Sequence, residues 1–184
     1  MKEIASKKVT KGIIKPIVMI GLMGAGKSRI GRELASKYGL AFIDTDDEIV
    51  KAAGCSISDI FKQYGEGAFR DVEERVISRL LTDEPRIIAT GGGAFMNKKI
   101  RKLITKKATS IWLKTELDVL IKRTATRSDR PLLEKGNPEK ILKTLMIERY
   151  PFYSKADIVV DSLDVTVEST VEAVAIAFEK FQNL

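Results

Sequence analysis

The feature that most constrains this chain is a glycine-rich stretch between two regular patterns. Residues Ile17 to Ile20 are all apolar, and they lead directly into the motif Gly21-x-x-x-x-Gly26-Lys27-Ser28. After this motif, Ile30 and Leu34 are spaced by four, which is typical of one face of a helix. The sequence therefore predicts a buried strand, a glycine-rich loop and a helix in immediate succession.

This spacing suits a P-loop, which binds phosphate. Glycines let several backbone N–H groups converge on one point, and the helix N-terminus adds its own unpaired N–H groups. In such a loop Lys27 reaches the outer phosphates and the Ser28 hydroxyl ligates Mg²⁺. The expected ligand is a nucleoside triphosphate with magnesium, contacted by Gly24, Ala25, Gly26, Lys27, Ser28 and Arg29. The alternative is an ordinary glycine-rich turn with a surface lysine, and the strand and helix on either side argue against it. The motif alone does not identify the phosphate acceptor.

Length and composition indicate one globular domain. The chain has 184 residues, of which 44% are apolar, and this is enough to bury a core. No apolar run approaches the ~20 residues that span a membrane, and the start lacks the apolar core of a secretory signal. A single cysteine, Cys55, provides no disulfide framework. We expect a cytoplasmic monomer that does not associate with membranes.

The positive charge gathers at the N-terminus. The formal net charge is +7, and residues 1–15 hold five lysines against one glutamate, so more than half of the excess lies there. This pattern predicts a flexible basic tail over 1–15 ahead of a single P-loop domain over 16–184. Neither the tail nor the basic cluster within 98–107 contains aromatic residues for base stacking, so we expect no nucleic-acid partner.

Strand and helix patterns alternate along the domain. Apolar segments of strand length occupy residues 17–20, 40–43, 86–90, 110–113 and 157–161, with helical patterns between them. Such alternation predicts parallel strands covered by helices on both faces. The expected architecture is α/β, a three-layer α/β/α P-loop NTPase fold with a five-stranded parallel sheet.

Polar residues follow two of these strands. Asp44 and Asp46 come after the second strand, and Gly91-Gly92-Gly93 comes after the third. Ligands of open α/β sheets bind beyond the carboxyl ends of strands, so we expect the two acids at the active site. Three consecutive glycines indicate either close approach of the main chain to a ligand or a tight turn.

Two further segments carry charged candidates. Arg70 and Glu73 are three residues apart on a predicted helix and can pair. Periodicity alone favours a surface ion pair there over a ligand site. Residues 124–138 are polar, arginine-bearing and bounded by Gly and Pro, which predicts a lid that closes over phosphates. The chain contains no histidine, so a general base must be a carboxylate, a lysine or a substrate group.

Together these residues resemble the shikimate kinase family from about Pro16 to Phe181. The motifs that carry the resemblance are Gly-Leu-Met-Gly-Ala-Gly-Lys-Ser, Phe-Ile-Asp44-Thr-Asp46, Phe69-Arg70-x-x-Glu73, Gly91-Gly92-Gly93, Arg130-Pro-Leu-Leu and Arg149-Tyr-Pro-x-Tyr153. The resemblance implies transfer of the ATP γ-phosphate to the 3-hydroxyl of shikimate in aromatic amino-acid biosynthesis. It thereby implies shikimate and ATP as partners and Mg²⁺ as the cofactor.

The resemblance also implies roles for individual residues. Catalysis falls to Asp46, Lys27 and Arg130, with Asp46 holding the substrate hydroxyls. From its position and the absence of histidine, we expect Asp46 to orient or deprotonate the attacking hydroxyl. Ser28 and Asp44 support the metal. Arg123, near the adenine, and Arg130, in the lid, complete the ATP site. The substrate-binding region spans about 44–82, and the substrate-binding residues are Asp46, Arg70, Glu73, Gly91, Gly92, Gly93 and Arg149.

Two other functions remain open from the sequence. One is a related small P-loop kinase acting on gluconate or a nucleotide. The other is a nucleotide-dependent binding module that associates with nucleic acid through the basic tail, with steeply salt-dependent affinity.

Overall fold

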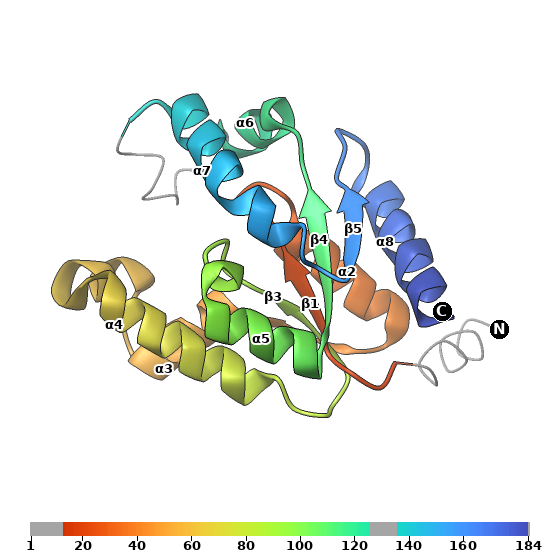
Figure 1. Cartoon of the computed structure of the whole chain (residues 1–184), viewed down its shortest axis with the longest axis horizontal. Helices are drawn as coiled ribbons and strands as arrows, with labels where there is room; N and C mark the ends of the chain where they lie inside the picture. The colour runs from red at the N-terminus through yellow and green to blue at the C-terminus, as the bar shows by residue number, and fades with distance from the viewer. Residues whose placement is uncertain (1–12, 126–135, 184) are drawn as a thin grey trace.

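A five-stranded parallel sheet forms the centre of the molecule (Figure 1). The computed structural model describes residues 13–125 and 136–183. The strands lie in the order β2-β3-β1-β4-β5, and every neighbouring pair is parallel. Their bounds are β1 Ile17–Ile20, β2 Ala41–Asp44, β3 Arg86–Ala89, β4 Thr109–Lys114 and β5 Ile158–Asp161. The predicted α/β fold with five parallel strands is confirmed.

The burial of each strand follows its position in the sheet. β1, at the centre, is buried along its whole length, and only the last residue of β4 is partly exposed. A strand covered on both faces needs a continuous apolar run, which is what residues 17–20 provide. β5 lies at the edge, and there Ile158 and Val160 are buried while Val159 and Asp161 are exposed. The apolar runs of the sequence thus identify the inner strands of the sheet.

Helices cover both faces of the sheet and give the three layers (Figure 1). α2 and α8 pack together on one face, where Tyr38 and Phe178 place their ring centroids 6.0 Å apart. α5 packs on the other face with α4 beside it, and α6 contacts α7. The helices are α2 Lys27–Tyr38, α3 Thr45–Ala53, α4 Ile57–Leu80, α5 Lys98–Lys107, α6 Leu117–Ala125, α7 Pro138–Tyr153 and α8 Val167–Gln182, with the short 3₁₀ helix η2 Ala94–Met96.

A non-helical backbone conformation at Gly65 divides α4 into two parts. Gly65 has φ 79° and ψ 178°, a backbone conformation that other residues rarely adopt. The chain is helical on both sides of this residue. The non-helical residue separates the first part of α4 from the part that carries Arg70 and Glu73.

The chain joins the hydrophobic core before Pro16, the expected start of the domain. Ile13 is buried in the hydrophobic core, although it falls within the expected tail. Residues 1–12 and most of the expected lid, 126–135, lie outside the described residues. Across the part of the chain that the structure describes, no helix is both long and apolar enough to cross a membrane.

Candidate active site

The P-loop adopts a backbone conformation that depends on its glycines. Gly24 has φ 84° and Gly26 has φ 95°, both in the left-handed region that favours glycine. Gly26 is also the N-cap of α2, and it supplies no side chain to bond the first N–H groups of that helix. By contrast, side chains cap the N-termini of five other helices: α3, α4, α5, α7 and α8. The start of α2 therefore keeps the N–H groups and partial positive charge that bind a phosphate.

Lys27 lies over the P-loop itself. Its Nζ donates hydrogen bonds to the carbonyl oxygens of Gly21 and Leu22, each at 2.9 Å. The ammonium group is partly buried there and sits at the loop that surrounds the expected phosphates. Lys27 is thus placed to exchange carbonyl oxygens for phosphate oxygens when a nucleotide binds.

Ser28 and Asp44 bring oxygen ligands together beside the P-loop. The Ser28 hydroxyl donates to Asp44 Oδ2 at 2.6 Å, although the two residues come from α2 and β2. The other oxygen, Asp44 Oδ1, accepts from the backbone N–H of Asp46 at 3.1 Å and caps α3. A hydroxyl and a carboxylate are hard ligands of the kind that Mg²⁺ prefers. Within residues 13–125 and 136–183 no three His, Cys, Asp or Glu side chains form a metal cluster, so a Mg²⁺ here would complete its shell with phosphate oxygens and water.

The turn Gly91–Gly93, called here the glycine turn, is the point where four charged side chains meet. A Cβ on Gly91 would lie 3.2 Å from both Asp46 Oδ1 and Glu73 Oε1. One on Gly92 would lie 3.1 Å from Arg149 Nη1, and one on Gly93 only 2.5 Å from Arg70 Nη1. None of the three glycines has a positive φ, so the closeness of neighbouring side chains, rather than backbone conformation, favours glycine here. The segment is a tight turn, closed by the Ala94 N–H on the Gly91 carbonyl at 3.1 Å, while close approach to a ligand stays a prediction.

Arg70 is held from two sides. Its Nη1 donates to Glu73 Oε2 at 2.8 Å, and its Nη2 donates to Glu66 Oε1 at 2.9 Å. Glu73 is fully buried, whereas the Glu66 side chain is 67% exposed. Burial raises the pKa of Glu73 above its usual value, and the hydrogen bond from Arg70 acts in the opposite direction. The predicted pairing of Arg70 and Glu73 is confirmed, but the pair does not lie at the surface, because Glu73 is buried and Arg70 is only partly exposed.

The glycine turn and the P-loop are adjacent because β1 and β3 are neighbours in the sheet. A Cβ on Gly92 would lie 3.5 Å from the carbonyl oxygen of Gly21. That same oxygen accepts a hydrogen bond from Lys27. The lysine of the phosphate loop and the four charged side chains of the glycine turn therefore face one shared region at the carboxyl ends of the strands.

Arg123 joins the P-loop to the loop after β5. Its Nη1 donates to Ser162 Oγ at 3.0 Å, and its Nη2 donates to the Leu163 carbonyl at 2.6 Å. Ser162 in turn donates to the Ala25 carbonyl at 3.2 Å. Arg29 is exposed on the first turn of α2, and Arg130 lies outside the described residues.

Comparisons with known proteins give a consistent family. The protein-family model for shikimate kinase matches residues 23–178. The chain belongs to the shikimate kinase family. A shikimate kinase from Paramagnetospirillum magneticum is 51% identical over 157 residues, covering 85% of this chain and 80% of that protein. One from Rhodopseudomonas palustris is 48% identical over 167 residues, covering 91% and 82%.

Solved structures of the shikimate kinase family agree with this assignment. The shikimate kinase from Acinetobacter baumannii in complex with shikimate superposes with a TM-score of 0.88 at 30% identity. The match covers 95% of this chain and 97% of that one. The predicted resemblance to the shikimate kinase family and the predicted P-loop kinase fold are confirmed over nearly the whole chain.

Several residues at this shikimate kinase site had no role in the sequence-based prediction. Thr45 accepts a hydrogen bond from the Gly91 N–H at 3.2 Å, and the Tyr153 hydroxyl donates to the Gly92 carbonyl. Ser162 links Arg123 to the P-loop. A signal existed for Tyr153 alone, because it follows Arg149 by four residues and so shares its helix face.

Proposed function

We propose that this protein transfers the γ-phosphoryl group of ATP to the 3-hydroxyl of shikimate. The products are ADP and shikimate 3-phosphate, an intermediate of aromatic amino-acid biosynthesis. The observation that carries the proposal is the glycine turn, where Asp46, Arg70 and Arg149 meet beside the first glycine of the P-loop. The solved relative that holds shikimate supports the acceptor, and family membership supports ATP as the donor. We further propose that the protein acts as a monomer in the cytoplasm.

The P-loop side would bind the nucleotide. The uncapped N-terminus of α2 offers N–H groups to the phosphates, and Lys27 offers a positive charge beside them. Transfer of a phosphoryl group needs neutralised charge and an aligned acceptor oxygen rather than covalent work by the protein. Residues 24–29, Arg123 and Arg130 would complete the ATP site, Arg130 by contacting phosphate as its family counterpart does.

Ser28 and Asp44 would hold Mg²⁺, the proposed cofactor. The ion, when bound, supplies charge that offsets the negative phosphate oxygens. Ser28 and Asp44 are already within hydrogen-bond distance of each other, so no rearrangement of the main chain is needed to offer both oxygens.

Arg70 and Arg149 would bind the shikimate carboxylate. Each guanidinium presents paired donors that match a planar carboxylate. The Nε and Nη2 edge of Arg70 is occupied by exposed Glu66, a type of ion pair that contributes little in water. A substrate carboxylate can displace Glu66, while buried Glu73 keeps the other side of the guanidinium fixed.

Asp46 would orient or deprotonate the attacking hydroxyl. It lies in the first turn of α3, with its Oδ1 beside Gly91 and its main chain fixed by Asp44. The chain contains no histidine, so a carboxylate is the natural proton acceptor. The hydroxyl proton passes to Asp46 as the γ-phosphoryl group passes from ATP to the substrate oxygen and leaves ADP.

Product identity tests this proposal. The wild-type protein incubated with ATP, Mg²⁺ and shikimate is expected to form ADP and one phosphate monoester in equal amounts. Phosphorus–proton coupling in the NMR spectrum should assign the ester to the 3-position. Release of inorganic phosphate in place of the ester, or an ester at another hydroxyl, would contradict the proposal.

A further inference from the structure

Each of the three peptide groups of the glycine turn is fixed by one hydrogen bond. The Gly91 N–H donates to Thr45 Oγ1 at 3.2 Å. The Gly91 carbonyl accepts from the Ala94 N–H at 3.1 Å, and the Gly92 carbonyl accepts from the Tyr153 hydroxyl. Glycine has the largest backbone freedom of all residues, so these three bonds decide how the turn is oriented.

The N–H groups that remain are those of Gly92 and Gly93. Among the residues that the structure describes, neither N–H donates a hydrogen bond. In a planar trans peptide the N–H points away from the carbonyl. The bond from Tyr153 to the Gly92 carbonyl therefore sets the direction of the Gly93 N–H, which points away from the tyrosine.

Tyr153 is itself rigidly held at the end of α7. Its side chain is fully buried, and its ring packs 5.9 Å from Trp112 and 6.1 Å from Tyr150. Burial raises the pKa of Tyr153 to about 12, although the neighbouring Arg149 acts in the opposite direction. The hydroxyl consequently keeps its proton at neutral pH and remains a donor to the glycine turn.

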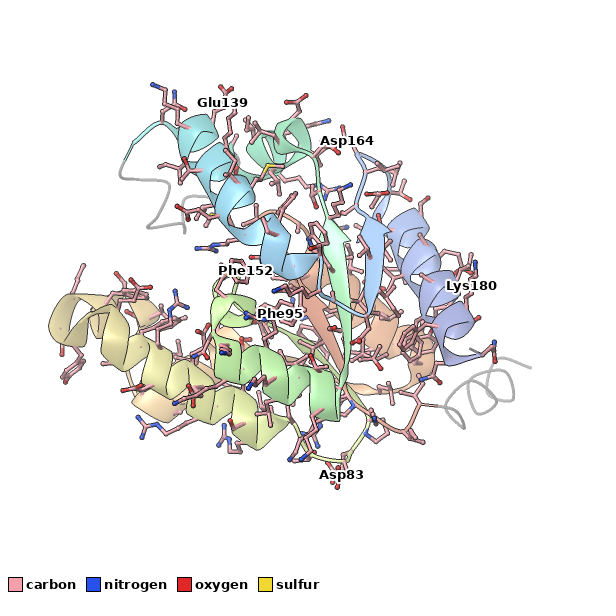
Figure 2. All side chains as sticks on the ribbon, in the orientation of Figure 1. Asp83, Phe95, Glu139, Phe152, Asp164 and Lys180 are labelled. Atoms are coloured by element: carbon pink, nitrogen blue, oxygen red, sulfur yellow. The ribbon has the colours of Figure 1, made fainter. Side chains whose placement is uncertain are left out.

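A second contact ties the same end of α7 to the segment after the glycine turn. Arg101 lies over the rings of Phe152 and Phe95, at 5.1 and 6.0 Å, and Figure 2 shows the two phenylalanines at the junction of α7 with this segment. Its Nη1 also donates to the Phe95 carbonyl at 2.7 Å. The end of α7 and the chain from Gly91 to Met96 thus pack as one unit.

We propose that Tyr153 is a positioning residue that sets the glycine turn and Arg149 in one geometry for the substrate carboxylate. Gly92 lies between them, because a Cβ there would be 3.1 Å from Arg149 Nη1 and 3.7 Å from the Tyr153 hydroxyl. A single hydroxyl thereby positions two groups that would receive the acid: the backbone N–H of Gly93 and the guanidinium of Arg149. This inference rests on the proposed function, since it assigns the site a carboxylate substrate.

The variant Tyr153→Phe tests it, with Tyr150→Phe as the matched control. Tyr150 lies on the same helix, packs against the same Trp112 at 4.8 Å and donates its hydroxyl to the Thr115 carbonyl. Each variant keeps its ring and loses one hydrogen bond from a hydroxyl to a carbonyl. Both are therefore expected to fold and to show a similar decrease in melting temperature. Tyr153→Phe should raise the KM for shikimate about tenfold, with kcat and the KM for ATP within about threefold. Tyr150→Phe should leave the KM for shikimate within about twofold.

Shikimate binding, measured without turnover, provides a second comparison of the two variants. Trp112 is the only tryptophan of the chain, so its fluorescence reports on this cluster. Shikimate titrations should show a weaker Kd for Tyr153→Phe and an unchanged Kd for Tyr150→Phe. Equal effects of the two variants on shikimate, or equal loss of ATP and shikimate affinity in Tyr153→Phe, would overturn the inference. If the wild-type protein does not phosphorylate shikimate at all, the proposed function fails instead.

The wild-type protein provides a test that does not depend on folding of a variant. If Tyr153 fixes the turn before substrate arrives, the Gly91 and Ala94 amides, which donate hydrogen bonds within the turn, should already exchange slowly without ligand. Fast exchange that becomes slow only when shikimate binds would show that the substrate orders the turn, and the inference would be wrong.

Discussion

Replacing Asp46 with asparagine is expected to lower kcat by about 10²-fold to 10³-fold, with the KM for ATP within about twofold. Asparagine keeps the size and the hydrogen-bonding oxygen of the side chain but has no capacity to accept the hydroxyl proton. The Asp46 carboxylate lies beside Gly91, whereas Lys27 bonds the P-loop carbonyls and Ser28 bonds Asp44, so nucleotide binding should persist. Initial rates at saturating shikimate measure the effect.

The control for this change is Asp47→Asn. Asp47 is the next residue of α3, is also exposed and loses the same unit of charge. It is expected to leave kcat within about twofold. Near-normal turnover of Asp46→Asn at saturating shikimate, or equal loss in both variants, would contradict the role of Asp46 as base.

Removing the guanidinium of Arg149 is expected to weaken shikimate binding by about 30-fold to 100-fold. A charge-assisted hydrogen bond contributes roughly 1.5–3 kcal/mol, and Arg149 is proposed to make a paired one. The KM for ATP should change little, because Arg149 lies at Gly92 rather than at the start of α2. Kinetics of Arg149→Ala with each substrate varied in turn give both constants.

Two comparisons separate carboxylate binding from a general loss of charge. Lys143→Ala removes a positive charge from an exposed position of the same helix and should leave both KM values unchanged. The methyl ester of shikimate lacks the carboxylate charge, so Arg149→Ala should hardly alter its weak binding. Loss of ATP and shikimate affinity in equal measure would refute the proposed carboxylate site.

Arg70→Ala should weaken shikimate binding in the same way as Arg149→Ala. It should also lower the stability of the protein, because Glu73 would remain buried without its partner.

The local sequence was sufficient to predict the P-loop and the order of strands. Residues 17–20 form a buried central strand because a continuous apolar run suits only a strand covered on both faces. The motif that follows, Gly21 to Ser28, is compatible with few backbone conformations, so its glycines directly predict where phosphate binds. The bounds of a helix such as α5 are harder to predict, since the exposed lysines at its end, Lys106 and Lys107, give no periodic signal.

The proposed shikimate-binding part of the site depends on contacts between residues far apart in the sequence, which no local pattern predicts. Periodicity placed Arg70 on a surface face of its helix, but the fold brings Gly93 against that face. Only the resemblance to a family indicated that Arg70 binds substrate. Likewise Glu73 is buried by distant segments of the chain, and the bond from Tyr153 to Gly92 joins residues 61 positions apart. Such pairs are determined by the packing of α4 and α7 beside the sheet, which a one-dimensional pattern does not contain.

The most direct test of the whole account is the initial rate of ADP release from ATP and Mg²⁺ with different acceptors. Shikimate should stimulate release strongly, with kcat/KM at least about 10³-fold above that for gluconate or a nucleoside monophosphate. Gluconate is acyclic and lacks the ring that would hold the acceptor hydroxyl in line, and the nucleotide lacks the carboxylate that we propose Arg70 and Arg149 to bind. Comparable stimulation by gluconate or by the nucleotide would contradict the assigned acceptor. Nucleotide hydrolysis that no acid stimulates, together with steeply salt-dependent binding to nucleic acid, would instead identify a binding module.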